Sequence, residues 1–263
     1  LLAEKVWGSR GGRAVYAAGT SNNDQMNYFN ITVPGNSVDF GNLITAKTRP
    51  AGVSSTTRGL FLGGYVAPAY INVIEYITLA TTGDAADFGD LTVGRRFGAD
   101  GGAGTSTRGF AMGGDADSYE NVIDYVTIAS LGNAADFGNL TVARTTGATT
   151  GSPVRVLHAN GTTGSVSNVI DYITAASVGD AIDFGDTTVS NMNRAGVSSN
   201  TRGVFGGGRN PVINVIDYVE FNTLGNAADF GDLSQSRGYL AGCSNEKRGV
   251  FVAGGTPSAV NTM

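Results

Sequence analysis

Acidic residues recur at fixed places along this chain of 263 residues. One set precedes a Phe-Gly pair, at Asp39, Asp87, Asp136, Asp183 and Asp229. A second set precedes a tyrosine, at Glu75, Asp124, Asp171 and Asp217, with Asn27 in the first copy. A ring of carboxylates could bind Ca²⁺, which takes about 6–8 oxygen ligands. Paired carboxylates could also hydrolyse a glycosidic bond.

The regular recurrence of these acids favours a structural role over both kinds of chemistry. An aspartate before Phe-Gly is expected to accept backbone N–H bonds in a turn. The acid before tyrosine is expected to pair between repeats with one of a set of recurrent arginines, because a partly buried carboxylate needs a partner. That set is Arg58, Arg108, Arg202 and Arg248. We therefore predict no catalytic residue and no metal site, and keep Ca²⁺ binding and catalysis as the weaker alternatives.

The remaining reactive residue types are single. His158 is the only histidine and Cys243 the only cysteine, so neither a Ser-His-Asp triad nor a metal cluster can be built on them. His158 is expected in a strand near a glycine turn, and Cys243 as a small buried residue. The glycine-rich stretch 98–109 lacks the Gly-Lys-Ser/Thr of a phosphate loop. No cofactor is predicted.

The elements that position these residues form a repeat. Residues 121–140, NVIDYVTIASLGNAADFGNL, return with few changes from Asn72, Asn168 and Asn214, and a more divergent copy begins at Met26. The tyrosines of the five copies stand at 28, 76, 125, 172 and 218, a spacing of 46 to 49 residues. A fixed period in this range indicates a repeat architecture.

Each repeat reads as about four short strands. They are a Gly/Ala-rich run after a basic residue (Arg49, Arg95, Arg194 or Arg237), an apolar run from arginine to glycine, the Asn-Val-Ile-Asp-Tyr run, and the Asp-Phe-Gly-Asp-Leu run. Alternating β-branched and aromatic residues, together with a total of 40 glycines, favour short strands and tight turns over helices. The Gly-Asn and Gly-Asp pairs are expected to be turns.

These repeats predict an all-β fold, a β-propeller of four-stranded blades with about 46–50 residues per repeat. The small first strand suits the crowded centre and the aromatic fourth strand the outer edge. Residues 1–263 form one domain, with repeats at about 1–47, 48–94, 95–143, 144–193 and 194–236 and a partial repeat at 237–263. Six blades are favoured, five is the alternative, and an open array also fits the sequence.

The two ends of the chain bear on how a ring would close. Residues 1–7 could supply a strand that completes the last blade. Residues 260–263 resemble the opening of a sixth tyrosine strand. The chain opens on Leu1 rather than methionine, so we expect a fragment or a processed product.

The composition of the chain argues against two classes of partner, nucleic acids and membranes. A net charge of −5 does not fit a nucleic-acid-binding surface, so no nucleic acid is expected. No apolar run approaches the ~18–20 residues that span a bilayer, so no membrane insertion is expected.

The segments between the Gly-Gly pair and the Asn-Val-Ile run differ between repeats whose cores are nearly identical. Variable loops on a rigid scaffold are where binding usually resides. The alternative is neutral variation in exposed loops. The candidates for contact with a ligand or partner are Tyr65, Tyr70, Asp115, Asp117, Tyr119, Arg209 and Asn210.

The order of motifs resembles a kelch repeat. The diglycines at 63–64, 113–114, 207–208 and 254–255 match, and the Asp-Tyr steps at 124–125, 171–172 and 217–218 resemble the kelch Tyr-Asp step in reversed order. Phenylalanine stands where kelch repeats usually carry tryptophan, at Phe88, Phe137, Phe184 and Phe230.

From about Arg13 to Met263, the amino-acid sequence of the repeat more closely resembles repeats in tail-fibre and other virion proteins of marine tailed phages. This resemblance implies a non-enzymatic structural or adhesion component on the surface of a virion. Its partners would be other virion proteins or a host surface receptor or glycan, and a homo-oligomer is compatible with it. A glycan-binding, lectin-type propeller is the alternative, and an enzyme on a propeller is third.

Overall fold

The computed structural model describes residues 6–8, 12–17, 22–33, 35–98, 101–245 and 247–256, and all its regular secondary structure is β-strand. The strands of these ranges form five four-stranded antiparallel sheets and one two-stranded sheet, each from consecutive strands. This confirms the prediction of an all-β fold with about four strands per repeat.

The strands follow the predicted segments. The first sheet holds β1 (Val6–Gly8), β2 (Arg13–Ala17), β3 (Asn23–Asn30) and β4 (Val38–Lys47). The second holds β5 (Ala51–Ser54), β6 (Arg58–Val66), β7 (Ala69–Thr78) and β8 (Ala86–Asp90). The third holds β9 (Gly102–Gly104), β10 (Arg108–Ala116), β11 (Ser118–Thr127) and β12 (Ala135–Asn139).

The fourth sheet holds β13 (Ala148–Gly151), β14 (Arg155–Ala159), β15 (Ser167–Thr174) and β16 (Ile182–Asn191). The fifth holds β17 (Ala195–Ser198), β18 (Arg202–Gly206), β19 (Val215–Glu220) and β20 (Ala228–Asp232). The sixth holds β21 (Ala241–Ser244) and β22 (Gly249–Val252).

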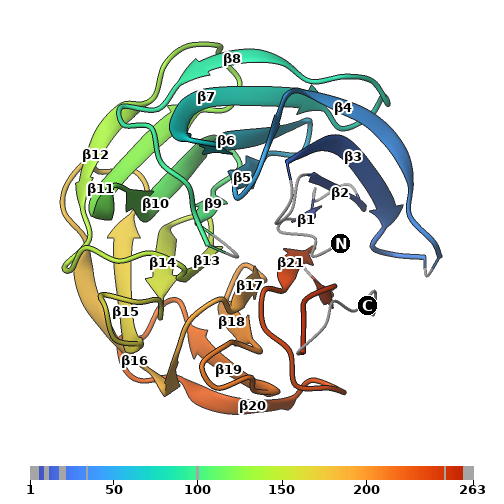
Figure 1. The fold of residues 1–263 in the computed structure, drawn as a ribbon. Helices are drawn as coiled ribbons and strands as arrows, with labels where there is room; N and C mark the ends of the chain where they lie inside the picture. Colours follow the sequence, from blue (N-terminus) through green and yellow to red (C-terminus); the bar gives the residue numbers. More distant parts are fainter. Residues whose placement is uncertain are drawn as a thin grey trace.

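The six sheets surround a common centre (Figure 1). The first strands lie innermost and contact one another in order: β1 with β5, β5 with β9, β9 with β13, β13 with β17, β17 with β21, and β21 with β1. Glycine permits this close approach, because a Cβ on Gly102 would lie 2.5 Å from the carbonyl oxygen of Gly52. The arrangement is consistent with a β-propeller-like fold.

The outer strands fill the space where the sheets diverge. Phe40, Phe88, Phe137 and Phe184 are buried in β4, β8, β12 and β16. Each packs edge-on against the tyrosine of its own sheet, with ring centroids 5.6–6.0 Å apart. The predicted placement of small residues inside and aromatics outside is confirmed.

The first and sixth sheets share a core. Ala14 and Phe29 of the first sheet form one buried cluster with Ala241, Cys243 and Val252 of the sixth. The guanidinium of Arg248 donates across the same junction to the carbonyl oxygen of Ile31, at 3.0 Å. These contacts join the two sequence-distant ends of the described chain.

The prediction that the N-terminal strand completes the last blade is wrong for the described residues. Val6–Gly8 pairs with β2, with Trp7 opposite Val15, and so forms the inner strand of the first sheet. This is the place that the Gly/Ala-rich strand holds in the other sheets. Residues 1–5 and the predicted sixth tyrosine strand at 260–263 lie outside the described ranges.

Candidate functional site

The antiparallel order divides the loops between two ends of the sheets. Turns between the first and second strands, and between the third and fourth, lie at one end. Hairpins between the second and third strands lie at the opposite end, together with the connections from one sheet to the next. The predicted loop candidates all belong to this second end.

Three of the predicted candidates meet around one arginine. Tyr65 and Tyr70 lie directly opposite each other in the β6–β7 hairpin, with ring centroids 5.2 Å apart. The guanidinium carbon of Arg96 lies 5.1 Å from the first ring centroid and 5.5 Å from the second. The same guanidinium donates to Asp115 Oδ2 from Nε at 2.9 Å and from Nη2 at 2.7 Å. We call these four residues the Tyr–Arg cluster.

The Tyr–Arg cluster spans two neighbouring sheets and stays partly exposed. The side chains of Arg96 and Asp115 are 28% and 18% exposed. Two aromatic rings and a guanidinium held in place by an ion pair form a pre-organised polar and aromatic surface. Such a surface can stack on a sugar ring or on a planar side chain of a protein partner.

Two further candidates lie on the adjoining β10–β11 hairpin. Asp117 occupies its turn with a positive φ of 52°. Tyr119 lies directly opposite Asp115 in the strand register and is 41% exposed. The hairpin therefore extends the Tyr–Arg cluster with one more aromatic ring and one more carboxylate.

The last two candidates lie elsewhere, between the fifth and sixth sheets. The guanidinium carbon of Arg209 lies 4.8 Å from the ring centroid of Tyr239. Asn210 follows with a φ of 84°. The structure therefore divides the seven predicted residues between two loop regions.

The acids before tyrosine form buried ion pairs, but not with the predicted arginines. Their partners are basic residues that precede the first strand of the same sheet. The nitrogen–oxygen distances are 3.0 Å for Lys47–Glu75, 2.8 Å for Arg95–Asp124, 3.0 Å for Arg144–Asp171 and 2.6 Å for Arg194–Asp217. Burial lowers the pKa of all four basic groups, and the adjacent carboxylate opposes that shift.

The same carboxylates also bind the preceding sheet. Thr92, which follows β8, donates to Asp124 from its hydroxyl at 2.5 Å and from its backbone N at 3.3 Å. Thr141 and Thr188 donate in the same way to Asp171 and Asp217. The carboxylate oxygens thus hold adjacent sheets together, as the structural interpretation of these acids predicted.

The arginines that were predicted as partners have a different role. Arg58 stacks over Tyr76 of its own sheet, 5.0 Å from the ring centroid, and donates to the carbonyl oxygen of Ile128 in the next sheet at 3.0 Å. Arg108 repeats both contacts, over Tyr125 and to Ala175. A guanidinium suits this position because it can stack and donate at once.

The prediction that the aspartates before Phe-Gly lie in turns is wrong. Asp39, Asp87, Asp136, Asp183 and Asp229 are exposed residues within the outer strands. Each lies directly opposite the acid, or in the first sheet the asparagine, that precedes the tyrosine. The register shifts beside each pair, as in a β-bulge, and in the four pairs of acids the residue before tyrosine is buried while the residue before Phe-Gly is exposed.

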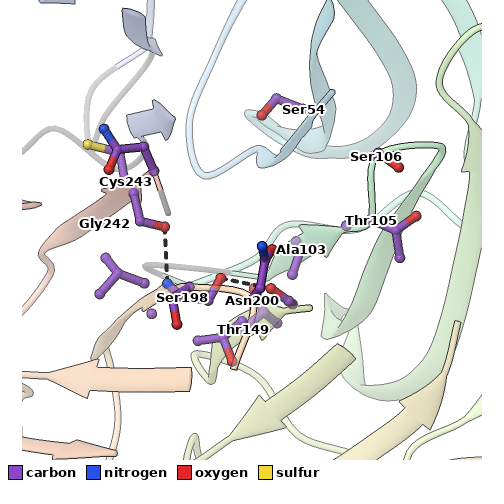
Figure 2. Close-up of a pocket in the computed structure, with 18 of the residues that line it drawn as sticks. Ser54, Ala103, Thr105, Ser106, Thr149, Ser198, Asn200, Gly242 and Cys243 are labelled. Carbon is purple, nitrogen blue, oxygen red and sulfur yellow. Dashed lines mark hydrogen bonds between the residues drawn. The ribbon is translucent and has the colours of Figure 1, made fainter. Parts of the chain in front are cut away.

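A polar cavity of about 130 Å³ lies at the opposite end, over the inner strands. Its lining is dominated by glycine, serine and threonine from five sheets, and Figure 2 shows Ser54, Thr105, Thr149 and Ser198 around it. Among the described residues the lining contains no charged side chain, and this polar, uncharged lining suits water or a small neutral polar group. Cys243 also lines the cavity, but its side chain is buried.

The single histidine and cysteine lie where they were predicted. His158 is buried in β14, directly opposite Thr149. Burial raises the pKa of the Cys243 thiol to about 12, which leaves it protonated and unreactive at neutral pH. In the described ranges, no three His, Cys, Asp or Glu side chains are grouped so that they could hold a metal ion. None of the described residues forms a helix that could span a membrane.

Sequence reasoning missed Arg96 and Tyr239. Arg96 follows the buried Arg95, at a position that is Thr48, Thr145, Met192 or Gly238 in other sheets. Comparison of this position between repeats could have singled it out. Neither a protein-family profile nor a curated protein matches the chain.

Proposed function

We propose that this chain is a six-bladed, kelch-like propeller that acts as a non-enzymatic binding component of a phage virion. In this role the ring is a rigid support, and the Tyr–Arg cluster contacts another virion protein or a host surface. The virion setting rests on the resemblance of the repeat to tail-fibre and other virion proteins.

The observation that carries the binding role is the asymmetry of the Tyr–Arg cluster. The buried ion pairs, the stacked arginines and the inner glycines recur from sheet to sheet and support the fold. At the four described positions equivalent to Arg96, the other sheets carry Thr48, Thr145, Met192 and Gly238, and none of these has a guanidinium. Its contacts with two tyrosines and Asp115 combine residues of one loop region that the scaffold does not require.

The ring closure is supported by the junction between the first and sixth sheets. Their shared hydrophobic cluster and the bond from Arg248 to Ile31 reproduce contacts of the other junctions. Closure would hold the loops in one geometry, and a rigid loop surface loses little entropy when it binds.

A lectin-type role is the second candidate, because stacked tyrosines beside a guanidinium and a carboxylate also suit a sugar. The two roles separate on a glycan array. A lectin would bind defined glycans, and the binding would be lost in Tyr70→Ala. A protein-contact surface would show no glycan binding on the same array.

The virion role is tested by mass spectrometry of purified phage particles from the source sample. Peptides of this chain at a stoichiometry typical of structural proteins would support the role, and their absence from particles would refute it. Binding of the purified protein to host cells or to particle proteins should fall at least tenfold in Arg96→Ala. Thr56→Ala, at the opposite end of the sheets, is the matched control.

A further inference from the structure

At four junctions, the outer strand of one sheet is covered by a turn of the next. The backbone N of Gly179 donates to the Phe137 carbonyl oxygen, and that of Ala181 to Asn139, both at 2.8 Å. In return, the backbone N of Asn139 donates to Asp180 Oδ1 at 2.8 Å. Three other junctions repeat this pattern, from Phe40 to Gly83, from Phe88 to Gly132, and from Phe184 to Gly225.

The covering turn buries the phenylalanine and requires the glycine that follows it. Phe40, Phe88, Phe137 and Phe184 are 1–3% exposed. A Cβ on Gly138 would lie 2.5 Å from the carbonyl oxygen of Gly179, and Gly89 and Gly185 face the next turn at the same distance. This contact leaves no room for a side chain at the glycine that follows the phenylalanine.

The fifth sheet has the same residues but an open edge. Its outer strand carries Asp-Phe-Gly-Asp at 229–232. Phe230 is 55% exposed, and no atom of the described residues lies within 4 Å of a Cβ placed on Gly231. The phenylalanine still packs on Tyr218, at 5.9 Å between centroids, so the strand is formed and only its covering turn is lacking among the described residues.

Two further features flank the same open position. Gly35 lies in the corresponding turn of the first sheet, and among the described residues its backbone N donates to no outer strand, whereas Gly83, Gly132, Gly179 and Gly225 each donate to the phenylalanine of the preceding sheet. Arg202 forms an ion pair with Glu220 of its own sheet at 2.6 Å, whereas Arg58, Arg108 and Arg248 donate to a carbonyl of the next sheet. Between these features lies the two-stranded sixth sheet (Figure 1).

We infer that the sixth sheet is the acceptor for a β-hairpin with the chemistry of this repeat. The hairpin consists of an Asn-Val-Ile-Asp-Tyr strand, a Gly-Asn or Gly-Asp turn and an Asp-Phe-Gly-Asp strand. Its first strand pairs with β22, and its turn covers Phe230 and Gly231. Its second strand receives the exposed turn at Gly35.

The four filled junctions argue for this occupant over any other. The acceptor residues are the same, and in every filled case the partner is a Gly-Asx turn that offers two N–H donors and one side-chain oxygen. Such a hairpin also supplies the strand edge that β22 leaves open in the described chain. The inference rests on the ring of sheets and not on the proposed adhesion role.

A labelled synthetic peptide tests the inference. The peptide carries residues 168–186, which include the turn at Gly179 and Asp180, and its binding to the whole chain is followed by fluorescence anisotropy. We expect saturable binding in the micromolar range and a second, independent readout, a rise in Tm with peptide concentration. A peptide with Asp180→Ala should bind at least fivefold more weakly, because it loses the acceptor for the backbone N of Asp232.

Two protein variants distinguish the proposed site from nonspecific pairing. Gly231→Ala should weaken binding at least tenfold, because its methyl group would meet the carbonyl of the docked glycine. Asp229→Asn should bind like the unchanged chain, since the equivalent Asp183 stays exposed at a filled junction. The melting temperature of each free variant shows that it is folded.

Three results would overturn the inference. The first is the absence of saturable binding, and the second is equal binding by the Gly231→Ala variant. The third is a stable oligomer in sedimentation that Gly231→Ala disperses and the peptide does not, since a second copy would then occupy the edge.

Discussion

Replacement of Asp124 by asparagine tests whether the buried carboxylates hold the sheets together. Asp124 is fully buried and accepts bonds from Arg95 at 2.8 Å and from the Thr92 hydroxyl at 2.5 Å. The substitution keeps the shape of the side chain but removes its charge. Arg95 then remains buried without a counter-ion, while its pKa is already lowered by burial.

The expected cost follows from that unpaired charge. Loss of one partner of a buried ion pair typically costs about 3–5 kcal/mol. The amide retains part of the hydrogen bonding, so we expect the lower end, about 3 kcal/mol. For a chain of this size, that loss lowers the melting temperature by roughly 6–12 °C.

Asp136 provides the matched control. It lies directly opposite Asp124 in the register of β11 and β12, but it is exposed. Asp136→Asn should change the free energy of unfolding by no more than about 0.5 kcal/mol. Urea denaturation followed by circular dichroism measures both variants. Equal losses for the two variants would refute the proposed role of the buried carboxylate.

Three further predictions follow from the same packing. Gly138→Ala should lower the melting temperature clearly more than Gly231→Ala, since both have a positive φ but only the first faces a backbone oxygen at 2.5 Å; equal losses would contradict the covering turn. Cys243 should react with a thiol reagent at pH 8 at least tenfold more slowly in the folded chain than in urea. Burial raises the pKa of this thiol to about 12, so the free energy of unfolding should fall as the pH rises from 9 towards 12. Cys243→Ser should remove that pH-dependent contribution. Fast labelling of the folded chain would contradict the burial of Cys243. Arg248→Ala should increase hydrogen exchange in the strand before Ile31, and unchanged exchange there would argue against the bond across the first and sixth sheets.

The repeat period predicted the sheets well because each copy has the same local sequence pattern. Alternating apolar residues define the strands, and the Gly-Asn and Gly-Asp pairs end them. The inner position of the Gly/Ala-rich strand followed from side-chain volume alone. The position of Val6–Gly8 as an inner strand did not follow from side-chain volume, because its sequence shares little with the Ala-Gly-Val-Ser strands that hold this position in other sheets.

The ion-pair partners could not be read from sequence, since two basic residues per repeat compete for one acid. The structure selects Lys47 rather than Arg49 in the second sheet. In the fifth sheet, Asn191 holds the position equivalent to Lys47, and Arg194, three residues later, supplies the charge. The basic side chain thus reaches the equivalent carboxylate, Asp217 instead of Glu75, from a different backbone position.

The contacts between the loop candidates could not be predicted from the sequence either. Tyr65 and Tyr70 were predicted because their loop varies, and they face each other because the hairpin register aligns them. Their contact with Asp115 depends on Arg96, which reaches across from the next sheet. A contact between repeats of this kind depends on the angle between sheets, which the spacing of motifs does not specify.

Energy transfer from the single tryptophan tests the ring most directly. Trp7 lies in β1, which contacts β21, and Lys247 is exposed in the turn that follows β21. An acceptor dye is attached to Lys247→Cys in a Cys243→Ser background, and donor quenching is measured with and without urea. The ring predicts strong transfer in the folded chain and its loss on unfolding. Transfer in the folded chain no greater than in urea would contradict the ring.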